Sequence, residues 1–246
     1  MTSFQRIVKY LSIGLAIALA ASIVVGGISI LGAILGWGRD KILDNPYDIE
    51  ISQEIETIEI DISAASLKIL KGDKFSISTN IEKLDVSAKN SRLYVKQNQR
   101  IVSGKVGDII LTIPANIQLK SFELDAGAGE VDIEALNAKN VEIDMGAGAL
   151  TIRGGSIDNL DLDLGVGETN LTAAINGDSD INCGVGETNI HLLGEKNDYT
   201  LDINTGVGSV TLDNTKIKGN TVLGNGKNKI AIDGGVGSIN IAFISE

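Results

Sequence analysis

A short pattern, two glycines separated by one residue, recurs through most of this 246-residue chain and constrains its fold more than any other feature. Four such pairs begin at 19-residue intervals, and two more follow after 22 and 29 residues. The flanking segments, such as FELDAGAGEVDI, alternate apolar and polar residues, which is the period of a half-buried β-strand. The paired glycines are Gly127 and Gly129, Gly146 and Gly148, Gly165 and Gly167, Gly184 and Gly186, Gly206 and Gly208, and Gly235 and Gly237.

A unit of about 19 residues with two short strands cannot bury its own apolar face, so successive units must stack. The segment 58–69 fits the pattern with serine and alanine in place of the glycines, and 84–95 fits it with one insertion. We therefore predict an all-β domain over residues 51–246, a β-solenoid or β-helix of ~19-residue coils in which each coil pairs with the next. The glycines are predicted to form corners with positive φ or close backbone approach.

The N-terminal region predicts a single transmembrane helix before the repeats. No charge occurs between residues 10 and 38, and the apolar run at 11–37 is long enough to cross a bilayer. A cleaved signal peptide is the alternative, although its apolar core would be shorter. Small residues at i, i+4 spacing (Gly14, Ala18, Ser22, Gly26) would permit a homo-oligomer through this helix, but such residues are common in membrane helices.

The charges beside this run predict its orientation. Arg6 and Lys9 precede it without a neighbouring acid, whereas Arg39, Asp40 and Lys41 follow it with mixed sign. By the positive-inside rule, residues 1–10 are cytoplasmic, 11–37 form the anchor, 38–50 form a linker, and 51–246 are extracytoplasmic. The predicted location is the cell membrane, with a single pass.

Composition excludes several functional classes. The formal charge is −11, and residues 1–50 contribute none of it, so the repeats would repel nucleic acid. Cys183 and His191 are the only residues of their kinds, which excludes an internal disulfide and a cysteine-based zinc site. We expect Cys183 to face inward and His191 to be solvated. A glycan-cleaving β-helix would need aromatic and basic residues, which are scarce after residue 120, so we expect no enzymatic activity and no cofactor.

Outward acidic residues are predicted to align between coils. Asp125, Asp144 and Asp163 each stand two residues before the first glycine of a pair. If the coils are in register, their carboxylates form a row of hard oxygen ligands suited to Ca²⁺. A solvated charged face without any metal is the alternative.

The run from Asp108 to Gly129 (DIILTIPANIQLKSFELDAGAG), followed by glycine-punctuated strands, resembles a bacterial family labelled putative adhesin. Its members are β-strand-repeat proteins of unknown function, and the apolar N-terminal segment is similar too. The resemblance covers roughly residues 45–246 and implies a β-solenoid on the cell envelope, with no assigned enzymatic activity and no agreed active-site residues.

Two functions follow from these observations. The first is a non-enzymatic, membrane-anchored envelope protein whose solenoid is an adhesin-like or stress-sensing surface for another envelope protein. The second is a module that binds a cation or a cationic peptide on its acidic face.

Overall fold

The computed structural model describes residues 42–97 and 106–245, and strands form most of them. The predicted cytoplasmic segment 1–10 and the predicted anchor 11–37 lie outside the described residues. Apart from one short 3₁₀ turn, η1 (Lys196–Asp198), the described secondary structure is all β. No helix in residues 42–97 or 106–245 combines the length and the apolar character that a membrane crossing requires.

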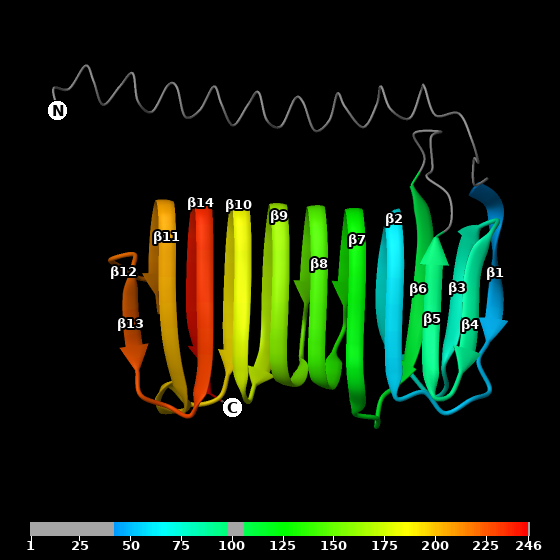
Figure 1. Cartoon of the computed structure of the whole chain (residues 1–246), viewed down its shortest axis with the longest axis horizontal. Helices are drawn as coiled ribbons and strands as arrows, with labels where there is room; N and C mark the ends of the chain where they lie inside the picture. The colour runs from blue at the N-terminus through cyan, green and yellow to red at the C-terminus, as the bar shows by residue number, and fades with distance from the viewer. Residues whose placement is uncertain (1–41, 98–105, 246) are drawn as a thin grey trace, which may run out of the picture.

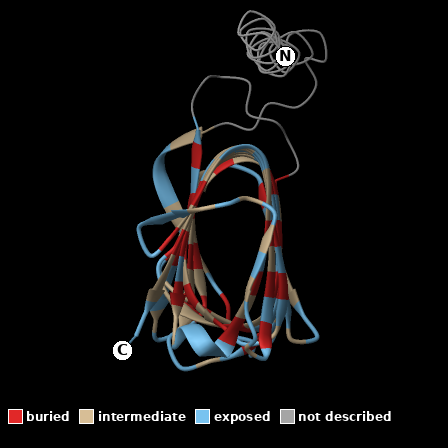
Figure 2. Ribbon diagram, turned by 90° about the vertical axis from the view of Figure 1, so that its left-hand side faces the viewer, coloured by how far each residue is buried: buried red, intermediate tan, exposed pale blue. Residues whose placement is uncertain are grey.

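The body of the molecule is a stack of seven long, bent strands (Figure 1). Seen along the stack, the ribbon rises on one side, bends over at the top and descends on the other side (Figure 2). We call the bent edge the crest and the opposite edge the base. The seven are β2 (Thr57–Gly72), β7 (Leu119–Ile133), β8 (Leu136–Ile152), β9 (Gly155–Ile175), β10 (Asp178–Leu193), β11 (Tyr199–Leu212) and β14 (Asn228–Ile244).

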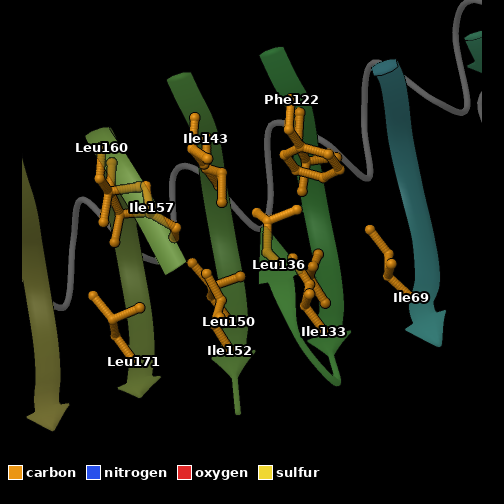
Figure 3. Packing of buried hydrophobic residues seen from close by; sticks show 14 of the residues in the cluster. Ile69, Phe122, Ile133, Leu136, Ile143, Leu150, Ile152, Ile157, Leu160 and Leu171 are labelled. Carbon is orange, nitrogen blue, oxygen red and sulfur yellow. The ribbon is translucent and has the colours of Figure 1, made fainter. Parts of the chain in front are cut away.

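The coils pair in parallel and in register, with a 19-residue offset between β7, β8, β9 and β10. Ile133 pairs with Ile152, which pairs with Leu171 in the next coil. These side chains and Ile69 lie in one buried row between the two sides of the stack (Figure 3). Burying such a side chain contributes about 1.5–3 kcal/mol, so rows of isoleucine, leucine and valine form the core that a single coil lacks.

The coils do not stack in the order of the sequence at the C-terminal end, where our prediction was wrong. β14 lies between β10 and β11 and is parallel to both (Figure 1). In this slot Gly237 pairs with Gly186 on one side and with Gly208 on the other. Because β10, β11 and β14 share the same glycine corner, β14 pairs in register with both of its neighbours. The free edge of β11 is covered by short antiparallel strands, which leaves the inner slot for β14.

Shorter strands close both ends of the stack. β11 is covered by β12 (Thr215–Ile217) and β13 (Thr221–Gly224). At the other end β2 pairs with two separate strands, one on each side of its corner, and these carry further antiparallel strands. The strands at this end are β1 (Ile42–Glu50), β3 (Ser76–Ile81), β4 (Leu84–Lys89), β5 (Arg92–Gln97) and β6 (Gly107–Pro114).

Two sequence predictions at this end need correction. The segment 84–95 is not a coil but the hairpin of β4 and β5, because Asn90 and Ser91 adopt positive φ and reverse the chain. Within the predicted linker 38–50, residues 42–50 form β1, which pairs with β3. The segment 58–69, in contrast, is a true coil whose Ile58 pairs with Phe122.

Side-chain amides replace the missing neighbour at the two terminal corners. At the first coil, Gln97 accepts hydrogen bonds on Oε1 from the backbone N–H groups of Ser63 and Ala64, both at 3.1 Å. At the other end of the stack, in the β11 coil, Asn220 Oδ1 accepts a hydrogen bond from the N–H of Thr205 at 3.2 Å. These corner N–H groups have no further coil to pair with, and the side-chain amides satisfy them instead.

Candidate functional site

The structure places Asp125, Asp144 and Asp163 in one exposed row beside the crest. Asp125 pairs with Asp144, and Asp144 pairs with Asp163, so the three stand side by side on adjacent coils. The carboxylates follow the stack and do not converge: in the part of the chain that the structure describes, no three His, Cys, Asp or Glu side chains form a group that could hold a metal ion. The full row, which we call the acidic row, is Asp61, Asp125, Asp144, Asp163, Asn182, Asp233 and Asn204.

Loss of solvation and the charges of neighbouring coils raise the pKa of one carboxyl group in each of two outward rows. Partial loss of solvation, followed by the charges of Asp163 and Asp125, raises the pKa of Asp144. In the outward row two residues earlier, loss of solvation and then the charges of Glu59 and Glu142 raise the pKa of Glu123. At Asp144 and Glu123 the folded state therefore favours the protonated carboxyl group more than the unfolded chain does.

A shallow cleft of about 450 Å³ lies along the acidic row at β9, β10 and β14. Its polar lining comes from Asp163, Asn182 and Asp233. Glycines form the rest of the outer lining, together with Leu164 and Cys183. The cleft exists because the first glycine of each pair, and also Gly234 in β14, carries no side chain.

The two glycines of a pair differ in geometry. The second one, for example Gly148, has a φ of +137°, and an added Cβ would lie 1.8 Å from the carbonyl oxygen of Gly129 in the adjacent coil. The first one, for example Gly146, has no positive φ, yet its Cβ would lie 2.5 Å from the carbonyl oxygen of Gly127. The second glycine is thus required for space in each pair and, except at Gly208, for a positive φ as well, whereas the first is required for space alone.

The residue between the glycines was not singled out in the sequence, yet it forms a continuous apolar line on the crest. Val166 and Val207 are 49% and 41% exposed. The sequence does indicate this apolar line, because the position between the two outward glycines is always alanine or valine. The line, which we call the crest row, is Ala64, Ala128, Ala147, Val166, Val185, Val236 and Val207.

A second cleft, which no pattern in the sequence indicates, lies at the base of the N-terminal end. It has a volume of about 480 Å³ and is formed by the loops around residues 51–56, 74–75 and 114–118. Ile51, Ile55 and Phe75 line it with buried apolar side chains. Three loops that are distant in the sequence meet here only because β1, β3 and β6 lie side by side.

Cys183 and His191 occupy unremarkable positions. Cys183 is half-buried, because its neighbour in β14 is Gly234, which covers it less than a side chain would. Its Sγ lies 3.7 Å from Oγ1 of the buried Thr169. His191 is exposed on the outer face of β10. Neither residue lies beside a candidate catalytic partner among the hydrogen bonds described for residues 42–97 and 106–245.

Comparisons with known proteins place the chain in a family. Two solved structures resemble it. The first is a "putative cell adhesion protein" from Clostridium sporogenes, which is 13% identical with a TM-score of 0.49; the match covers 81% of this chain and 99% of that one. The second is a "putative adhesin" from Bacteroides fragilis, which is 14% identical with a TM-score of 0.38; the match covers 80% of this chain and 95% of that one. The comparison with curated proteins gave no match. The model of the Toastrack DUF4097 family matches residues 50–242. The chain therefore belongs to the Toastrack DUF4097 family.

Proposed function

We propose that this protein is a non-enzymatic envelope protein, anchored by residues 11–37, whose extracytoplasmic β-solenoid is an adhesin-like or stress-sensing interaction surface. The observation that carries the proposal is the in-register stack itself, which repeats the same outward residues on adjacent coils. Repeat proteins commonly use such extended surfaces for binding rather than for catalysis. The cleft at the base of the N-terminal end adds a concave point with buried apolar side chains where a partner can dock.

Extraction of membranes from cells that express the full chain tests the anchor. Alkaline carbonate releases peripheral proteins, whereas a helix that spans the bilayer stays inserted. We expect the full-length chain to remain in the membrane pellet. Recovery of full-length chain in the supernatant would contradict the anchor.

The cleft along the acidic row favours a second candidate function, the binding of a divalent cation or a cationic peptide. Asp163 and Asp233 line this cleft on either side of Asn182. A ligand that binds only the folded state raises the melting temperature with its concentration. Millimolar Ca²⁺ should therefore raise it more than sodium chloride of equal ionic strength, and equal shifts in the two salts would exclude a cation site.

A further inference from the structure

The chain enters the described domain at its crest edge. Ile42, the first residue of β1, pairs with Ile81. A Cβ added to Gly107 would lie 3.0 Å from Cδ1 of Ile42, so these two residues are in contact. Gly107 in turn pairs with Ala65, the neighbour of the first residue of the crest row. In Figure 1, β1 begins at the same edge as the bends of the long strands and runs away from it.

Only four residues, 38–41, separate this entry point from the apolar run at 11–37. Even fully extended, the five Cα–Cα steps from residue 37 to Ile42 span at most about 18 Å. The crest edge at Ile42 is therefore held close to any bilayer that residues 11–37 cross. The base lies about 25 Å farther along the strands, from the rise of about 3.3 Å per residue.

We propose that the crest row lies on the surface of the bilayer in which the chain is anchored, so that the stack runs parallel to the membrane and the base faces away from it. This inference rests on the proposed anchor. The crest row extends for about 29 Å, six strand spacings of about 4.8 Å. Its exposed valines, Val166 and Val207, offer apolar contacts to the interfacial layer, and the short tether supplies a high effective concentration that makes weak contacts sufficient.

The alternative arrangement, with the stack standing upright on its N-terminal end, would turn β1 toward the lipid. That strand presents Asp44, Asp48 and Glu50 together with Pro46, which is a polar edge. The crest row is apolar over its whole length, so the parallel arrangement fits a bilayer better.

The residues that flank the crest row determine which lipid headgroups it can contact. The acidic row lies on one side, and Glu130, Glu168 and Glu187 follow the second glycines on the other side. These carboxylates would be repelled by an anionic leaflet. Net-neutral lipid headgroups are therefore the preferred surface.

A pair of labels on the same coil tests the arrangement. Val207 is at the crest of the β11 coil, and Asn197 is in the exposed turn η1 at its start. In a Cys183→Ala background, Val207→Cys or Asn197→Cys would be labelled with a fluorophore in the full-length chain, reconstituted in phosphatidylcholine vesicles with a headgroup-linked quencher. Val166→Cys is a second crest variant, and circular dichroism reports the fold of each.

We expect the V207C and V166C labels to lose emission when the quencher lipid is present, and the N197C label to keep it. The loss should be smaller when phosphatidylglycerol replaces part of the phosphatidylcholine. Equal emission from V207C and N197C in a chain that resists alkaline extraction would overturn the crest contact and leave the anchor intact. Release of the chain from the vesicles by alkali would overturn the anchor and this inference with it.

Discussion

Six of the seven coils turn at two glycines whose requirements are not the same. Glycine at such a spacing predicted a corner, but sequence alone offered positive φ and close approach as alternatives without assigning them. The structure assigns both to the second glycine, as at Gly148, because a carbonyl oxygen of the adjacent coil fills the space of its Cβ. The first coil has Ala65 at this position, where it pairs with Gly107 and has no positive φ.

Replacing Gly148 by alanine should destabilise the fold strongly. The positive φ alone costs about 1–3 kcal/mol, and the overlap with Gly129 adds to it. The matched control is Ala147→Val, because the neighbouring coil β9 already carries a valine, Val166, at this crest position. We expect a large fall in melting temperature for G148A and a small one for A147V; similar shifts for the two would show that the corner does not require glycine.

Asp144→Asn should stabilise the protein at neutral pH. At a spacing of about 4.8 Å, each pair of adjacent charges repels by about 0.9 kcal/mol in water before salt screening. Because the pKa of Asp144 is raised in the folded state, the folded protein binds this proton more tightly than the unfolded chain does. The associated stability is present below the unfolded pKa and is lost as the pH rises through the folded pKa.

Protonation of Asp144 should therefore raise the wild-type melting temperature as the pH falls from 7 to the range in which carboxyl groups titrate. D144N should start higher at pH 7 and gain less on acidification. Thermal melts of both proteins across this range measure the difference, with the exposed Asp73→Asn as control. A lower melting temperature for D144N at pH 7 would contradict the repulsion.

At the scale of the element, the repeats were predictable and their order was not. Every coil carries the same alternation and the same corner, so the sequence predicts that coils pair but cannot distinguish among partners. The order is decided by β12 and β13, which cover the outer edge of β11 and force the last coil inside. These strands have three and four residues and no repeat pattern, so nothing in the sequence marked them as a cap.

Disulfide cross-linking distinguishes the two orders. Asp180 of β10 pairs with Ala231 of β14, and Ala231 also pairs with Asp202 of β11. In a Cys183→Ala background, D180C/A231C should cross-link, because adjacent strands are about 4.8 Å apart. D180C/D202C should not, because two spacings of about 9.6 Å exceed the roughly 7 Å limit for a disulfide. Cross-linking of D180C/D202C but not of D180C/A231C on non-reducing gels would show instead that the coils stack in the order of the sequence, β10, β11, β14.

At the scale of the whole molecule, the fold is a finite stack with different ends and different edges. Short antiparallel strands and the amides of Gln97 and Asn220 close its ends, which protects them from pairing with other chains. The sequence predicted the outward position of Asp125, Asp144 and Asp163 because alternation fixes the exposed side of a strand. It could not reveal the base cleft, whose three loops come together only through the order of the end strands.

Labelling of Asn197→Cys in intact cells tests the proposal that an anchored solenoid is displayed outside the membrane. Asn197 is exposed in η1, so a thiol there reacts without unfolding. Cells that express the full chain with Cys183→Ala and Asn197→Cys would be treated with a membrane-impermeant maleimide before and after lysis. An anchored, extracytoplasmic solenoid should be labelled equally in both samples, on a protein that sediments with the membrane. Labelling only after lysis, or on a protein found in the soluble fraction, would contradict it.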